Sequence, residues 1–179
     1  MDLDSIKVNT VLQEVKEGAD YLNDIAQRVI EEYTKDLTSI INEINDLRQN
    51  GIISIDVLED LLLRLEHTLH FMGRKMEDVG FREDMSKIIK QQAYNTAYLN
   101  NDVTRIDEDG KKVKPTKDAN VSFAEEESKY QNMIYNIYDR VYKMIKFEID
   151  SGYEHLGSLK KMYSRRMQEY DIDRFQNRG

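Results

Sequence analysis

Two short clusters in the sequence contain residue types that bind metal ions. His67 and His70 are three residues apart with Glu66 beside them, which is part of a zinc ligand set. A zinc site needs three or four ligands, but the only other histidine is the distant His155 and the chain contains no cysteine. We therefore interpret these residues as structural and expect no metal site.

The second cluster, Asp107-Glu108-Asp109-Gly110, has some features of a calcium-binding loop. If Gly110 were the invariant glycine at the sixth position, Arg105 would be the first ligand and Thr116 the twelfth. Neither residue is a carboxylate, so the template does not fit. The cluster instead predicts a tight turn.

Catalytic motifs are absent from the sequence. It contains no glycine-rich phosphate loop, no nucleophile elbow and no Ser/His/Asp set with a suitable spacing. The many carboxylates suit exposed helix faces, where they pair with Lys or Arg four residues away. We expect a protein that is not an enzyme and that needs no cofactor.

Basic residues near tyrosines indicate a different chemistry. Lysine and arginine can neutralise phosphates, while unstacked bases lie on aromatic rings, so such clusters suit single-stranded nucleic acid. The alternative is that the charges are solvated helix faces and the tyrosines are core or interface residues. The candidate nucleic-acid-binding residues are Arg82, Lys87, Lys90, Tyr94, Lys111, Lys112, Lys114, Lys160, Lys161, Arg165 and Arg166.

The charge of the chain is unevenly distributed. The net charge is −8, but residues 1–60 contain 5 Lys/Arg against 14 Asp/Glu, and the remainder contains 21 against 20. Local basic clusters act within a Debye length of about 8 Å. The overall acidity therefore does not exclude phosphate binding by residues 61–179.

Long helices must position these residues. Apolar residues from Val8 to Leu47 follow steps of three and four, which predicts one amphipathic helix that ends at Asn50-Gly51. Ser54 is the expected N-cap of a second helix with a leucine-rich seam, so the two helices should form a hairpin. Gly73 and Gly80 either allow close helix approach or interrupt this second helix, and we favour a kink or break near Gly80.

Residues 100–121 change in character. Short alternating segments flank the Asp-rich turn, which predicts a small β-hairpin at about 102–117, with a disordered loop as the alternative. Ser122-Phe123-Ala124-Glu125 matches a capping box and predicts that the last helix runs from 122 to about 170.

The last helix has two apolar stripes, and a single hairpin partner can cover only one of them. One stripe includes Met133, Ile137 and Val141. The other is rich in tyrosine, which is enriched in subunit interfaces, so we expect a homo-oligomer. The predicted interface consists of Tyr135, Tyr138, Tyr142, Ile145, Ile149 and Tyr153.

The expected fold is all-α, with long amphipathic helices in a helical hairpin or coiled-coil arrangement and a small β-hairpin or loop insertion. We divide it into an acidic helical arm at 1–50 and a helical core at 51–179, within which 100–121 is the hairpin or loop. No apolar run is long enough to span a membrane, and no secretion signal is visible. We expect a cytoplasmic protein.

The layout from about residue 65 to 170 resembles the UvsY-like recombination mediators of tailed phages. The similar parts are a helix that ends in basic residues, alanine and tyrosines, a polar loop, and a long aromatic final helix from Tyr130 to Arg166. The basic, alanine and tyrosine positions here are Lys87, Lys90, Ala93, Tyr94 and Tyr98.

The resemblance implies a small helical protein that forms ring-like homo-oligomers and binds single-stranded DNA. It also implies that the protein helps a RecA-like recombinase to displace single-strand-binding protein, inside a bacterial host cell if the chain is phage-encoded. The family's DNA contacts match Lys87 and Lys90, and more loosely Arg82. The acidic N-terminal helix and the longer loop depart from the family layout.

Three hypotheses follow from the sequence. The first is an oligomeric single-stranded-DNA-binding recombination mediator. The second is a phage-type adaptor or inhibitor that binds a host protein through its acidic helical surface. The third is an architectural coiled-coil component with neither activity.

Overall fold

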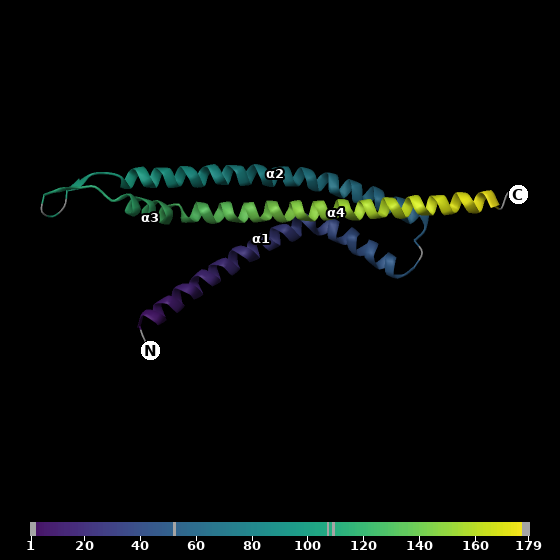
Figure 1. Ribbon diagram of the computed structural model, residues 1–179, viewed down its shortest axis with the longest axis horizontal. Helices are drawn as coiled ribbons and strands as arrows, with labels where there is room; N and C mark the ends of the chain where they lie inside the picture. Colours follow the sequence, from purple (N-terminus) through teal and green to yellow (C-terminus); the bar gives the residue numbers. More distant parts are fainter. Residues whose placement is uncertain (1–2, 52, 107, 109, 177–179) are drawn as a thin grey trace. The chain divides into compact units, whose positions relative to one another are not determined.

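The protein is all-α with one small β-hairpin, as the sequence predicted (Figure 1). The computed structural model describes residues 3–51, 53–106, 108 and 110–176, with side chains described at position 18 and from 20 onward. The elements are α1 (Leu3–Gln49), α2 (Ile55–Asn101), β1 (Arg105–Ile106), β2 (Lys112–Val113), α3 (Lys117–Glu127) and α4 (Lys129–Gln176).

The turn between α1 and α2 has the predicted chemistry. Gly51 has a φ of 121°, a conformation that an L side chain rarely adopts, and it follows the last turn of α1. The Ser54 hydroxyl then accepts a hydrogen bond from the Val57 amide at 3.4 Å. Ser54 is therefore the N-cap of α2, and glycine and serine together determine where one helix stops and the next begins.

The chain forms two compact units that do not coincide with a division at residue 50. Unit 1 consists of Met1–Gln27 and Val79–Tyr142, and unit 2 consists of Arg28–Asp78 and Lys143–Gly179. Helices α1, α2 and α4 each contribute to both units. The acidic helix α1 therefore does not form a separate unit.

Unit 2 has an aliphatic core to which three helices contribute. Leucine and isoleucine side chains from α1, α2 and α4 are buried there, and such residues gain most from removal from water. The largest buried ones are Leu37, Ile44, Leu58, Leu61, Leu65, Leu69, Ile145 and Leu159.

Gly152 allows the three helices of unit 2 to approach closely. A Cβ atom at this position would lie 2.5 Å from Leu69 Cδ2 of α2 and 3.2 Å from Leu37 Cδ1 of α1. A helical glycine costs about 0.5–1 kcal/mol relative to alanine, so the close packing of α4 has to offset this cost. Gly152 is therefore a packing residue of the unit 2 core.

Ion pairs on the surface of unit 2 connect the same helices. Arg64 of α2 donates two hydrogen bonds to the Glu43 carboxylate of α1, at 3.1 and 2.7 Å, and a third to Asp60 at 3.2 Å. These hydrogen bonds, chiefly those that Arg64 donates to Glu43 and then the one to Asp60, raise the pKa of the Arg64 guanidinium above its ordinary value. Lys160 of α4 pairs with Glu66 of α2 at 2.6 Å.

In unit 1, α2 lies along α3 and the first part of α4. The sequence analysis favoured a break near Gly80, and this expectation is wrong because α2 is helical through that residue. A Cβ at Gly80 would lie 3.1 Å from the Tyr142 ring of α4. The glycine therefore allows an aromatic ring to approach the helix, which was the alternative interpretation.

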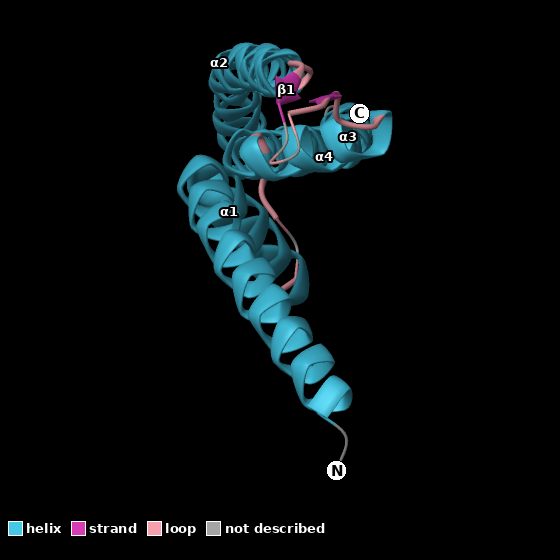
Figure 2. Cartoon of the chain, turned by 90° about the vertical axis from the view of Figure 1, so that its left-hand side faces the viewer, coloured by secondary structure: helices cyan, strands magenta, loops and turns pink. Residues whose placement is uncertain are grey.

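The β-hairpin is present as predicted (Figure 2). Arg105 is opposite Val113, Ile106 is opposite Lys112, and Gly110 in the turn has a φ of 76°. This positive φ is suited to glycine, and it closes the turn between the two strands.

Buried amides anchor the hairpin to the ends of α2 and α3. Asn101 donates a hydrogen bond to Asn120 at 2.9 Å, and Asn120 donates one to Asp102 at 2.9 Å. Lys114, just after β2, pairs with Asp102 at 3.0 Å, and Arg105 donates to Asn101 at 3.0 Å. Because Asn101 and Asn120 are buried, these bonds hold both ends of the hairpin in place.

The predicted capping box at Ser122 is wrong. Helix α3 begins at Lys117, because the Thr116 hydroxyl accepts a hydrogen bond from the Ala119 amide at 3.3 Å and caps the helix six residues before Ser122. Ser122 lies inside α3 and is exposed. The helix ends at Ser128, whose hydroxyl donates to the Ala124 carbonyl at 2.7 Å, and α4 follows at Lys129.

Among the described residues, no helix is both long enough and apolar enough to span a membrane. The longest helices carry charged residues throughout their length.

Candidate functional site

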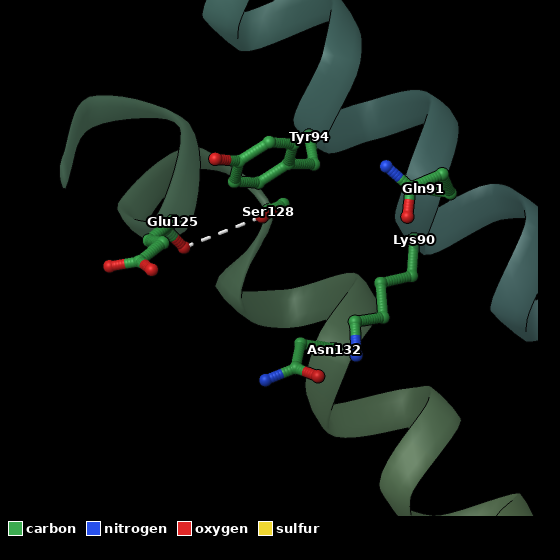
Figure 3. Close-up of a pocket in the computed structure, with 6 residues that line it drawn as sticks. All are labelled: Lys90, Gln91, Tyr94, Glu125, Ser128 and Asn132. Carbon is green, nitrogen blue, oxygen red and sulfur yellow. Dashed lines mark hydrogen bonds between the residues drawn. The ribbon is translucent and has the colours of Figure 1, made fainter. Parts of the chain in front are cut away.

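A polar cavity of about 500 Å³ lies in unit 1, where α2 faces the junction of α3 and α4 (Figure 3). Helix α2 contributes residues at successive positions of one face, and the junction contributes the others. The cavity is lined by Lys90, Gln91, Tyr94, Glu125, Ser128 and Asn132. Gln91 and Glu125 are exposed, so the cavity opens to solvent.

Local structure at the α3–α4 junction shapes one wall of the cavity. The Ser128 hydroxyl donates to the Ala124 carbonyl at 2.7 Å and also lies 3.5 Å from the Glu125 carbonyl. The backbone N–H of Asn132 donates a helical hydrogen bond to the Ser128 carbonyl at 2.9 Å. The two helices are therefore nearly continuous, and Glu125 and Asn132 lie on opposite sides of the junction.

Lys90 is a half-buried cation that extends from α2 towards α4. Its Nζ lies 4.7 Å from the centroid of the Tyr135 ring, a cation–π contact worth about 0.5–1 kcal/mol at an exposed site. No ion pair of Lys90 with a carboxylate occurs in the described part of the chain. The ammonium group therefore retains hydrogen-bond donors for a ligand.

Tyr94 is the aromatic residue of the cavity wall. Its ring stacks with Tyr98 one turn further along α2, with a centroid distance of 6.4 Å and an interplanar angle of 26°. Both tyrosines are half-buried. Because stacking restricts ring rotation, Tyr94 presents an ordered aromatic surface next to Lys90.

The predicted nucleic-acid-binding residues divide by unit. Seven of them (Arg82, Lys87, Lys90, Tyr94, Lys111, Lys112 and Lys114) are in unit 1, and Lys160, Lys161, Arg165 and Arg166 are in unit 2. Only Lys90 and Tyr94 line the cavity of unit 1. Lys160, Lys161 and Arg165 line a separate hollow of about 360 Å³ in unit 2.

The predicted cations also differ in whether they form an ion pair. Lys114 pairs with Asp102, Lys160 with Glu66 and Arg166 with Glu169, so their charge is already compensated. Arg82 and Lys111 also have interaction partners. Within the described residues, the predicted cations that make no ion pair are Lys87, Lys90, Lys112, Lys161 and Arg165.

The predicted oligomer interface is partly wrong. Ile145 and Ile149 are buried in the core of unit 2, because α1 and α2 together cover more of α4 than a single hairpin partner would. Tyr135, Tyr138 and Tyr142 are half-buried, and Tyr142 lies against Gly80. Tyr153 is 54% exposed, so it remains available to a partner.

An exposed apolar row on α2 was not identified from the sequence. Phe81, Met85, Ile88, Ile89 and Leu99 all lie on the surface of unit 1, and Phe81 is 68% exposed. Their helical spacing was visible as a continuation of the amphipathic pattern, but the exposed face depends on which side α3 and α4 cover. Gln91, Ser128 and Asn132 were also missed, because uncharged amides and hydroxyls carry no periodic signal. Glu125 was assigned to a capping box and not to a site.

The histidine pair makes ring contacts. His67 and His70 both lie edge-on to Phe71, with centroid distances of 4.6 and 5.6 Å, and both are exposed. Among the described residues, no three His, Cys, Asp or Glu side chains gather in a metal-binding arrangement. Asp107 and Asp109 of the turn cluster lie outside the described residues.

Comparisons with known proteins do not identify a family for this chain. No family model matches the sequence, and neither the curated proteins nor the solved structures include a match. The resemblance to UvsY-like mediators therefore stays a prediction that rests on the layout of helices, basic residues and tyrosines alone.

Proposed function

We propose that the protein binds single-stranded DNA through unit 1 and acts as an oligomeric recombination mediator that helps to load a RecA-like recombinase. The observation that carries the proposal is the position of Lys90, which is without an ion pair among the described residues, lines a polar cavity together with Tyr94 and contacts the Tyr135 ring. Such a mediator acts in the cytoplasm, which for a phage-encoded protein is that of the bacterial host.

The chemistry of this surface suits an unpaired strand. Phosphates bind the exposed Lys87 and the half-buried Lys90, and unstacked bases lie on tyrosine rings. Base stacking on aromatic rings is worth about 1–3 kcal/mol per base and does not require a particular sequence. A duplex hides its base faces, so the surface favours a single strand.

Oligomerisation is supported by the apolar side chains that unit 1 leaves exposed. Phe81, Ile88 and Leu99 of α2 expose half or more of their surface to solvent. A partner subunit that covers them removes apolar area from water, at about 25 cal/mol per Å². Several copies also multiply a modest DNA-binding surface into an avid one.

Fluorescence anisotropy with a labelled single-stranded oligonucleotide tests DNA binding. The double variant Lys87→Glu/Lys90→Glu should weaken binding strongly at low salt. Each lost phosphate contact should also reduce the salt dependence of log K by about 0.7. A matched control is Lys35→Glu/Lys146→Glu, which replaces two exposed lysines of unit 2 and makes the same charge change outside the proposed site.

The outcome distinguishes DNA binding from an unrelated function. Absence of binding by the wild-type protein at low salt would refute the proposal, as would equal binding by the double variant and the control. The mediator role has its own measurement, which is the rate at which a RecA-like recombinase assembles on DNA coated with single-strand-binding protein. The wild-type protein should accelerate assembly, and Lys87→Glu/Lys90→Glu should not.

A second candidate function is an adaptor or inhibitor that binds a basic host protein. The observation that favours it is the pair of exposed carboxylates Glu32 and Asp36 in the part of α1 that belongs to unit 2. Deleting α1 is an unsuitable test, because Leu37 and Ile44 belong to the core of unit 2. Replacing the exposed carboxylates with amides should abolish partner capture without loss of helicity if this function is correct.

A further inference from the structure

The cavity of unit 1 has a lining that restricts the class of its ligand. It combines one aromatic ring, one ammonium group, two amides, one hydroxyl and one carboxylate. An apolar ligand would bury these polar groups without hydrogen bonds, at a cost of about 1–3 kcal/mol each. The ligand must therefore have polar edges as well as a flat surface.

The charges in the cavity exclude two further classes of ligand, metal ions and free anions. A metal ion would find a single carboxylate, Glu125, which is too few ligands. A free anion would meet Lys90, but it would also meet Glu125 at the same cavity. A ligand that carries its negative charge at one end and a neutral planar group at the other fits this arrangement best.

We propose that this cavity is a nucleotide subsite, which holds one unstacked nucleotide of a DNA strand. The base lies on the Tyr94 ring, the amides of Gln91 and Asn132 hydrogen-bond its edges, and the adjacent phosphate binds Lys90. The inference rests on the proposed function and adds a defined place for a single base. A cavity of about 500 Å³ is within the size range of small-molecule sites.

The positions of the side chains support this orientation. Figure 3 shows Tyr94, Gln91 and Lys90 on α2, with Lys90 directed towards α4 and Glu125 on the other helix of the junction, α3. The phosphate binds at Lys90, because the Glu125 carboxylate repels it from the α3 side. The Gln91 Nε2 donates one hydrogen bond to Asn95 Oδ1 at 3.0 Å, which leaves Gln91 one donor and its acceptor. Each of the two amides therefore offers a donor and an acceptor, so the subsite accepts any of the four bases.

Two strands of equal length and charge test the subsite: a labelled oligonucleotide with bases, and one in which every nucleotide is abasic. The wild-type protein should bind the base-bearing strand more tightly. Tyr94→Ala should lower the affinity for that strand by about 5-fold to 150-fold, which is the range for one stacked base. Gln91→Ala and Asn132→Ala should each lower it by about 2-fold to 10-fold.

The chain offers matched controls for both amides. Gln92 is the exposed neighbour of Gln91 on α2, and Asn136 is exposed one turn beyond Asn132 on α4. Neither residue lines the cavity. Gln92→Ala and Asn136→Ala should bind both strands like the wild type, and Tyr94→Phe should retain binding because it keeps the ring. Circular dichroism verifies that every variant is helical.

The outcomes separate the subsite from the wider function. Equal binding of both strands by the wild type would refute the subsite. Cavity variants that bind the base-bearing strand like their controls would also refute it. In either case, DNA binding through charge would remain. If the wild type binds neither strand at low salt, both proposals fail. A loss that is confined to the base-bearing strand in the cavity variants supports the subsite.

Discussion

The two units differ in what they bury. Unit 2 buries large aliphatic side chains from three helices, including Leu37, Leu65 and Leu69. In the described part of unit 1, the buried residues include Ser86, Asn101, Asn120 and Ser128, while large apolar side chains such as Phe81 are exposed. Unit 2 also exposes large apolar side chains, such as Phe147, so the units differ in the aliphatic core that unit 2 buries. We therefore expect unit 2 to contribute more of the stability.

The difference has a physical cause in the number of helices that meet. A helix with neighbours on two sides can bury a wide apolar face, whereas a helix with one neighbour leaves the opposite face in water. Gly152 brings the three helices of unit 2 together, while unit 1 relies on side-chain hydrogen bonds such as Asn101–Asn120.

A pair of leucine substitutions on α2 compares the units directly. Leu69→Ala removes a side chain that is 1% exposed in unit 2, and it should lower the free energy of unfolding by about 2–5 kcal/mol. Leu99→Ala removes one that is 70% exposed in unit 1, and it should change that free energy by less than about 0.5 kcal/mol. Urea unfolding measures both, and equal losses would contradict the division of roles.

The amide network of unit 1 provides the second prediction. Asn120→Ala leaves the Asn101 amide and the Asp102 carboxylate without their hydrogen bonds to Asn120, which should cost about 1–3 kcal/mol. The exposed Asn100 is the control, and Asn100→Ala should be neutral. Hydrogen exchange should become faster in the hairpin of the Asn120 variant. Unchanged exchange would show that the network does not anchor the hairpin.

Two glycines of α4 test the close packing of unit 2. A Cβ at Gly152 would meet Leu69 and Leu37, so Gly152→Ala should lower the thermal midpoint, because overpacking costs about 1–3 kcal/mol. Nothing lies within 4 Å of a Cβ at Gly157, so Gly157→Ala should raise the midpoint through a gain of about 0.5–1 kcal/mol. Shifts of the same sign would mean that the helices adjust without cost.

The smallest expected effect concerns the surface ion pair of unit 2. Glu43→Gln weakens the double hydrogen bond with Arg64, and it should lower the free energy of unfolding by about 0.2–1 kcal/mol at low salt. The loss should shrink as salt screens the pair. Glu59→Gln, an exposed residue of the same unit, controls for the charge change. An effect larger than that of Gly152→Ala would show that unit 2 depends on charge pairing.

Much of the fold was predictable because it depends on local chemistry. Gly51 and Ser54 marked the turn between α1 and α2, and Gly110 marked the hairpin. The capping box at Ser122 failed because Thr116 offered an equally good cap six residues earlier, and a capping pattern does not distinguish a helix start from a helix interior. Competing local signals are resolved by the surrounding structure.

The candidate site was only partly predictable. Lys90 and Tyr94 were identified because charged and aromatic residues are conspicuous on a predicted helix. Gln91 and Asn132 were not, because an amide becomes part of a site only when two helices bring it to a cavity. Lys114 and Lys160 were indistinguishable from Lys90 in the sequence, yet each pairs with a carboxylate distant in sequence.

The long helices, their turn and the hairpin follow from local sequence, because periodicity, capping and glycine conformation act over a few residues. Which apolar stripe became core depends instead on tertiary contacts. Ile145 and Ile149 are buried because α1 and α2 both cover α4, whereas Phe81 and Leu99 stay exposed. The sequence of an amphipathic helix shows that its apolar face must be covered. Which element covers that face depends on contacts between segments that are distant in sequence.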